Sequence, residues 1–206
     1  MIFDPVELFP PIVWKGEYEF DWDSLELVAD TCLDMTHLPT NLEHGNARSS
    51  VGITGKGNIL SEFQPHKRKE LFDFVEWIET PIREIMKKWS YGSNLPIKIF
   101  NSWVNEHYRG GYTEEHVHPL VNFVVTAYLK VPENSGNILI RDPFFEMRSM
   151  EPLVADRNQW KEIVLKDNDV LIFPGWLPHK TQVSETDQRR VVLTMNVIVD
   201  RTKIEM

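Results

Sequence analysis

Cysteine, dense positive charge and long apolar runs are all scarce in this sequence. The chain has 206 residues and a single cysteine, Cys32, which excludes an intrachain disulfide framework. No apolar run approaches the roughly 18 residues that a membrane-spanning helix needs. The first residues also lack the basic and apolar regions of a signal peptide. We therefore expect a cytoplasmic protein that has no membrane partner.

Basic residues are too few for a protein whose main role is to bind nucleic-acid phosphates. The formal net charge is -9 and the sequence pI is about 5.3. The main basic clusters, at 66–69 and 87–88, are short and indicate a solvated helix face. Nucleic acid is therefore a disfavoured partner. Cys32 has no basic neighbour in sequence and is expected to be a small core residue rather than a nucleophile.

The first 95 residues carry helical periodicity and are expected to form a layer that packs on the rest of the chain. A short strand is expected within 8–20, and a helix over 24–35 that begins at an N-cap Asp23. After a glycine-containing loop or hairpin at 38–60, a second helix is expected from Pro65 to Met86. Pro81 predicts a kink in this helix or two abutting helices.

From residue 96 the apolar pattern changes to a period of two, which is typical of strands. The first strand is expected to place one set of side chains on a common face. That set is Ile97, Ile99, Asn101, Trp103 and Asn105. Further strands are expected at 122–131, 137–141, 162–166, 169–173 and 189–200, with a long insertion at 144–160. The pattern predicts a mainly β, α+β chain with an antiparallel sandwich or double-stranded barrel at 96–206, in a single domain overall.

Three histidines are candidates for a metal site. His116 and His118 would point the same way if they belong to a strand, and His179 follows another apolar run. Imidazole suits Zn, Cu, Fe and Ni, and a catalytic metal site typically takes three protein ligands. The mouth of a barrel would bring the three together. Three nearby carboxylates are alternative ligands: Glu114, Glu115 and Asp142.

Two adjacent arginines open the last expected strand. Because side chains alternate along a strand, only one of Arg189 and Arg190 can point into the barrel. A buried guanidinium must be paired, and a carboxylate of a small ligand is a natural bidentate partner.

Several short motifs follow one another in a characteristic order along residues 97–200. They are His116-Val117-His118-Pro119, Tyr128 to Pro132 with Ser135-Gly136, Arg141-Asp142-Pro143, Leu171 to Pro174, Leu177-Pro178-His179 and Arg190 to Asn196. Their order and spacing resemble a branch of the 2-oxoglutarate and Fe(II)-dependent oxygenases. This branch includes many phage and marine bacterial proteins of unassigned substrate.

The resemblance implies a double-stranded β-helix, that is, a cupin-like jelly roll, with a metal and a co-substrate at its mouth. His116, His118 and His179 would hold Fe(II), and Arg190 would bind 2-oxoglutarate. His118 departs from the wider superfamily, which has Asp or Glu at this position. Val192 replaces a hydroxyl residue of many members, so Tyr128, Thr194 or Thr126 would complete the 2-oxoglutarate site. The expected pocket-lining residues are Trp103, Asn105 and Asn196.

The implied activity consumes O2, decarboxylates 2-oxoglutarate to succinate and hydroxylates a small molecule or peptide that the sequence does not identify. Two alternatives stay open at this point. One is a cupin-like three-His metalloenzyme that does not use 2-oxoglutarate, and the other is a non-catalytic β-barrel binding module. A homodimer is also compatible with the sequence.

Overall fold

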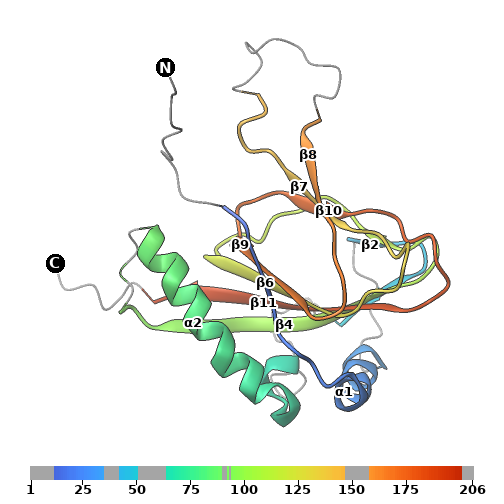
Figure 1. Cartoon of the computed structure of the whole chain (residues 1–206), viewed down its shortest axis with the longest axis horizontal. Coiled ribbons are helices and arrows are strands. Elements are labelled where there is room, and N and C mark those ends of the chain that lie inside the picture. Colours follow the sequence, from blue (N-terminus) through green and yellow to red (C-terminus); the bar gives the residue numbers. More distant parts are fainter. Residues whose placement is uncertain are drawn as a thin grey trace, which may run out of the picture.

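Two antiparallel sheets form the centre of the molecule. The computed structural model describes residues 12–34, 42–50, 64–89, 92, 94–146 and 158–200. The strands are β1 Trp14–Glu17, β2 Glu43–His44, β3 Ala47–Ser49, β4 Ile97–His107, β5 Tyr112–Thr113, β6 Phe123–Lys130, β7 Ile138–Arg141, β8 Trp160–Ile163, β9 Asp169–Pro174, β10 His179–Thr181 and β11 Arg190–Val199. The larger sheet has the order β1-β9-β6-β11-β4-β3 and the smaller one β10-β7-β8, whereas β2 pairs with β5 (Figure 1).

An apolar cluster between the two sheets makes them one barrel. It joins inward side chains of the larger sheet, such as Tyr128, Phe173 and Val192, to Ile138 and Ile140 of β7. The mainly β, jelly-roll fold that the sequence predicts is thereby confirmed. The expected strands lie close to their predicted positions, although β8 starts two residues earlier and the short strands β5 and β10 were not predicted. β2 and β3 lie in the segment expected to be a loop or a hairpin, but they pair with β5 and β4 rather than with each other.

Two helices cover the outer face of the larger sheet (Figure 1). These are α1 (Trp22–Asp34) and α2 (Phe72–Lys88), and two 3-10 turns at Pro65–Lys67 and Lys69–Leu71 lead into α2. Buried residues of both helices pack with outward residues of β6 and β11 in a second apolar cluster. The central strands are consequently buried on both faces, which explains their nearly continuous apolar sequence. No helix among the described residues is long and apolar enough to cross a membrane.

The helix boundaries differ from the predicted ones in two ways. Asp21, rather than Asp23, caps α1, because its carboxylate accepts hydrogen bonds from the backbone N–H and the hydroxyl of Ser24. The alternative of two helices divided at Pro81 is wrong, since α2 continues through this residue. Buried residues before and after Pro81, such as Ile78 and Ile82, are anchored in the same core and offset the cost of the proline.

A β-bulge in β4 changes which side chains share a face. Asn196 of β11 pairs with Asn101, and the next residue, Val197, pairs with Ile99, so Phe100 is the extra residue of the bulge. Ile97 and Ile99 therefore pack against the helical layer, whereas Asn101, Trp103 and Asn105 line a pocket. The predicted common face is wrong for the two isoleucines.

Parts of several predicted segments lie outside the described residues. These parts are 8–11, 35, 38–41, 51–60 and 147–157.

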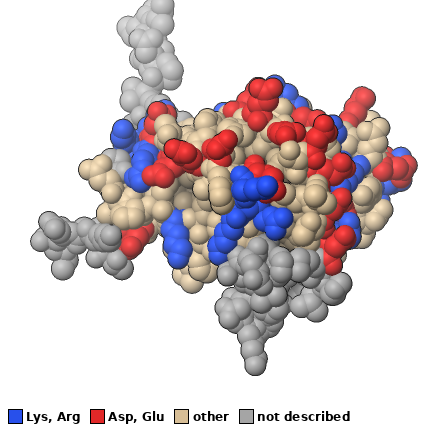
Figure 2. All heavy atoms as spheres, turned by 90° about the horizontal axis from the view of Figure 1, so that it is seen from below, with Lys and Arg blue, Asp and Glu red and all other residues tan. Residues whose placement is uncertain are grey.

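A buried carboxylate on β4 ties α1 and β3 to the larger sheet. Glu106 is fully buried and forms ion pairs with Arg48 and Arg189. Arg189 also pairs with Asp30 of α1, with Nη2 lying 2.5 Å from Oδ1. On the face shown in Figure 2, acidic side chains likewise lie among the basic ones rather than apart from them.

Candidate metal centre and ligand pocket

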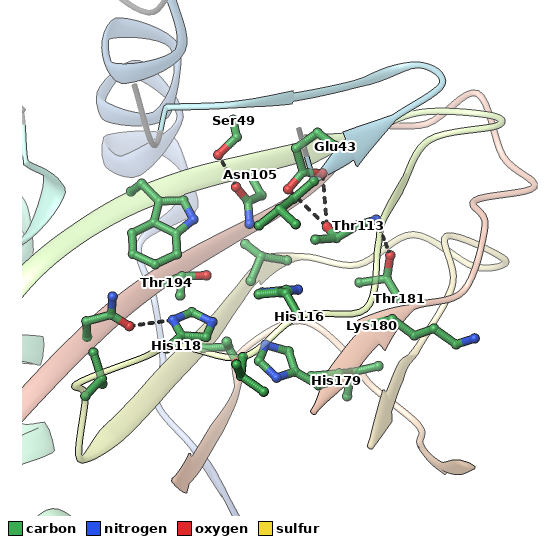
Figure 3. Close-up of a pocket in the computed structure, with 18 of the residues that line it drawn as sticks. Glu43, Ser49, Asn105, Thr113, His116, His118, His179, Lys180, Thr181 and Thr194 are labelled. Carbon is green, nitrogen blue, oxygen red and sulfur yellow. Dashed lines mark hydrogen bonds between the residues drawn. The ribbon is translucent and has the colours of Figure 1, made fainter. Parts of the chain in front are cut away.

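Three histidines from two distant segments meet at one end of the barrel. His116 and His179 form a single antiparallel bridge in which each backbone N–H donates to the other residue's carbonyl, at 3.0 and 3.1 Å. The N–H of His118 donates to the carbonyl of Gly175, at 2.8 Å, in the turn that precedes His179. A strand that contains both His116 and His118 was considered from the sequence, but the structure has no regular strand there. The backbone hydrogen bonds to His179 and Gly175 bring the side chains together instead. One ligand atom from each ring lies within 4.8 Å of the others (Figure 3).

The hydrogen bonds of the three rings determine which nitrogen faces the centre. In each ring Nδ1 lies beside an oxygen that can only accept, so Nδ1 carries the proton. The partners are the Glu114 carbonyl for His116 (2.7 Å), the Asn196 side-chain oxygen for His118 (2.6 Å) and the Leu177 carbonyl for His179 (2.9 Å). Each Nε2 therefore carries a free lone pair. The Nε2 atom of His118 is buried without a hydrogen-bond partner among the described residues.

Burial keeps these imidazoles neutral. Desolvation lowers the pKa of His118 to about 4, lowers the pKa of His116, and holds the pKa of His179 well below its usual value. A neutral imidazole with a free Nε2 is the form that binds a metal ion.

The three carboxylates considered as alternative ligands do not belong to this cluster. Glu114 contacts His44 at 2.8 Å, and Glu115 pairs with Arg141 at 3.3 Å. Asp142 accepts a hydrogen bond from the backbone of the turn that follows it. Among the described residues, the cluster that could hold a metal consists of the three histidines.

The histidines lie in a cavity of about 610 Å³ in the barrel. The three histidines, the inward arginine, the expected hydroxyl partners and the expected wall residues all line this cavity: His116, His118, His179, Arg190, Tyr128, Thr126, Thr194, Trp103, Asn105 and Asn196. The Trp103 indole stacks on His118 with ring centroids 5.7 Å apart, and Phe173 meets His179 edge-on at 4.8 Å. Aromatic rings therefore restrict two of the imidazoles.

Arg190 is the inward member of the arginine pair, as predicted. Its side chain is buried, and Nη1 donates to Nδ1 of His107 at 3.1 Å. Its Nε has no hydrogen-bond partner among the described residues. The guanidinium also lies 5.6 Å from the ring of Tyr128, whose hydroxyl accepts a hydrogen bond from Thr126. Burial lowers the pKa of Arg190 and raises that of Tyr128, but an arginine stays protonated in proteins.

Several solved structures share this fold. A prolyl-4-hydroxylase from Pseudomonas putida is 11% identical with a TM-score of 0.58, and the match covers 92% of this chain and 93% of that one. SnoK, a carbocyclase from nogalamycin biosynthesis that depends on alpha-ketoglutarate, is 12% identical with a TM-score of 0.60, at 90% and 79% coverage. HygX from Streptomyces hygroscopicus, solved with nickel, 2-oxoglutarate and hygromycin B, is 10% identical with a TM-score of 0.59, at 92% and 84% coverage.

A family model matches most of the β core. Residues 101–196 match the family described as "Putative 2OG-Fe(II) oxygenase", where 2OG stands for 2-oxoglutarate. Over these residues the β core resembles the 2OG-Fe(II) oxygenases. No curated protein sequence matches the chain.

Part of this pocket was not predicted from the sequence. Glu43, His107 and Thr113 line it beside Arg190. His107 could have been found by extending the alternation of Trp103 and Asn105 along β4. Glu43 gave no such signal, because it lies in a two-residue strand outside the periodic part of the chain.

Proposed function

We propose that this oxygenase is a hydroxylase in which His116, His118 and His179 hold Fe(II) and Arg190 holds 2-oxoglutarate. One observation carries the proposal. Three neutral imidazoles with converging lone pairs share a cavity with a buried guanidinium whose Nε has no partner.

The donor set fits a catalytic iron site. Imidazole nitrogen is a ligand that suits iron, and three protein ligands leave coordination positions for a co-substrate and O2. All three ligands are neutral, so the full charge of the ion would remain to attract the keto-acid end of 2-oxoglutarate. When bound, the iron with 2-oxoglutarate and O2 supplies the oxidising chemistry, which yields succinate, CO2 and a hydroxylated product.

Arg190 fits the far carboxylate of 2-oxoglutarate. Nη1 is engaged by His107, which leaves the edge formed by Nε and Nη2 for a bidentate carboxylate. A carboxylate there would satisfy the orphaned Nε and neutralise a buried cation, which are both large free-energy gains. The hydroxyl groups of Thr194 and Tyr128 line the same cavity and would complete the set of donors.

The remaining pocket wall would orient the substrate and keep water out. Trp103 shields His118, while Asn105 and Asn196 add polar groups to the wall. The similar proteins named above are a prolyl-4-hydroxylase, a carbocyclase and a protein solved with hygromycin B bound. Because these chemistries differ so much, the fold does not select among them, and the substrate of this hydroxylase stays open between a small molecule and a peptide.

The first test is an anaerobic titration of the Fe(II)-loaded protein with 2-oxoglutarate, followed by visible absorption. We expect the charge-transfer band of a keto acid chelated to iron, and succinate release after O2 is admitted. Arg190→Ala should leave the iron content unchanged and weaken 2-oxoglutarate binding by about tenfold or more, since a charge-assisted contact is lost.

The matched control is Arg109→Ala, because Arg109 forms an exposed ion pair with Asp187 outside the pocket. This variant should titrate like the wild-type protein. Bound iron without the absorption band would contradict the proposal and would favour a three-His metalloenzyme that binds its substrate directly.

A further inference from the structure

Arg190 is the end of a buried hydrogen-bonded chain that starts at a carboxylate. Its Nη1 lies 3.1 Å from Nδ1 of His107, and Nε2 of His107 lies 2.8 Å from Oε2 of Glu43. A guanidinium can only donate, so Nδ1 must accept. The imidazole proton is then on Nε2, from which it is donated to the Glu43 carboxylate. One neutral tautomer of His107 satisfies both neighbours.

The environment of His107 agrees with this tautomer. Its side chain is 2% exposed and that of Glu43 is 6% exposed. Burial lowers the pKa of His107, and the positive charge of Arg190 lowers it further against the opposing effect of Glu43. The negative charge of Glu43 and the positive charge of Arg190 thus face each other across a neutral ring.

Strand pairing determines the arrangement of this chain. His107 lies opposite Arg190 in the pairing of β4 with β11, and Glu43 lies opposite Thr113 in the pairing of β2 with β5. The Thr113 hydroxyl donates to Glu43 at 3.0 Å, and its N–H donates to the hydroxyl of Thr181 at 2.8 Å. Thr181 ends β10, the strand that begins with His179. Figure 3 shows Glu43 and Thr113 in the same pocket as the three histidines.

We propose that His107 and Glu43 are positioning residues that hold the Arg190 guanidinium with its Nε edge towards the pocket, ready for the far carboxylate of 2-oxoglutarate. The inference rests on the proposed role of Arg190. Without this chain, a long side chain would have to be ordered when the ligand binds, and a buried cation would lack compensation in the free protein. Glu43 lies outside residues 101–196, so the N-terminal layer contributes to the co-substrate site.

The test measures the dissociation constant of 2-oxoglutarate by calorimetry on Zn(II)-loaded protein, in which zinc replaces iron and no turnover occurs. Metal content is measured on every sample. His107→Leu removes both hydrogen bonds, and we expect it to weaken 2-oxoglutarate binding by about tenfold or more without loss of the metal. His107→Gln keeps one acceptor and one donor and should restore most of the affinity.

Two further variants separate positioning from a general structural role. Glu43→Leu should weaken binding less than His107→Leu does, because Nδ1 of His107 still accepts from Arg190 while its Nε2–H loses the Glu43 carboxylate. His66→Leu is the matched control: His66 also bonds to β4, through Ser102, but lies outside the pocket. It should bind 2-oxoglutarate like the wild-type protein. If His107→Leu fails to fold, Glu43→Leu and the comparison of His107→Gln with wild type carry the test.

The possible failures are distinguishable. Wild-type protein that binds zinc but not 2-oxoglutarate would overturn the role of Arg190 and the positioning chain together. Wild-type protein that binds 2-oxoglutarate, with His107→Leu or Glu43→Leu binding it equally well, would overturn the positioning chain alone.

Discussion

At the scale of single residues, the proposed metal centre depends on the oxygen atoms that accept hydrogen bonds from Nδ1 of its three histidines. Two of these oxygens belong to the backbone, and the third is the side-chain oxygen of Asn196, 2.6 Å from Nδ1 of His118. Such partners set the tautomer and the ring orientation of a metal-binding histidine. Asn196 is therefore the partner that a substitution can remove.

Asn196→Leu should lower metal affinity by about 10–100-fold, the range for loss of a partner that orients a ligand. The buried Nδ1–H of His118 would lose its acceptor, and the ring would be free to turn. Competition with a chelator of known affinity measures the change. Thr194→Val on the same strand is the control, because it changes a pocket hydroxyl that does not bond to the histidines. Equal affinities for Asn196→Leu and wild type would argue against a metal at this position.

The residues of the candidate site were predictable where they follow a period. Arg190, Thr194 and Asn196 alternate along one strand and so share a face, which the structure turns into the barrel. The alternation alone left open whether Arg189 or Arg190 points inward, and the family resemblance chose Arg190. Glu43 was not predictable, because its position depends on a contact between segments that are far apart in sequence. The same applies to the bridge between His116 and His179.

At the scale of secondary-structure elements, the sequence predicted the type of element better than its detailed geometry. The longer strands and both helices were expected, but the bulge at Phe100 was not. One inserted residue reverses the alternation for the first part of β4, and nothing in its local sequence marks the change. The continuity of α2 through Pro81 was not predictable either. Packing of the helix against the sheet outweighs the local preference of proline to break a helix.

The ion-pair network on β4 should contribute much more to stability than an exposed pair does. Glu106→Gln would leave the guanidinium groups of Arg48 and Arg189 without their buried carboxylate. We expect the free energy of unfolding to fall by about 1.5–3 kcal/mol, because charge-assisted hydrogen bonds to a buried carboxylate are lost while both arginines keep other acidic partners. Urea denaturation gives the value.

An exposed ion pair offers the matched comparison for this prediction. Asp187→Asn removes the carboxylate that pairs with Arg109. The side chain of Arg109 is 59% exposed and that of Asp187 is 80% exposed. Its cost should be below about 1 kcal/mol. A similar small cost for Glu106→Gln would mean that the network does not hold α1 against the sheet.

At the scale of the whole molecule, burial of neutral histidines makes folding sensitive to acid. Burial lowers the pKa of five histidines, and the pKa values of His66 and His118 fall to about 4. The five are His66, His107, His116, His118 and His179. In the unfolded chain each would titrate near 6.5. Between these values the unfolded state binds more protons than the folded state.

The free energy of unfolding of the metal-free protein should therefore rise with pH from about 4.5 to 7 and then level off. The contribution of each histidine is fully present above its unfolded pKa and is lost as the pH falls towards its folded pKa. Urea denaturation at several pH values measures this slope. His66→Leu removes one of the five groups and should make the slope shallower. A profile that is flat over this range would mean that the histidines are solvated or paired in the folded protein.

The backbone bridge between His116 and His179 has one further consequence, which concerns the timescale of the site. Each of the two amide hydrogens is held by the other residue's carbonyl, so exchange with deuterium requires the two segments to separate. Both amides report on a single opening event, although one belongs to a loop and the other to a strand. Their common exchange rate is thus a direct measure of how often the end of the barrel that carries the three imidazoles comes apart.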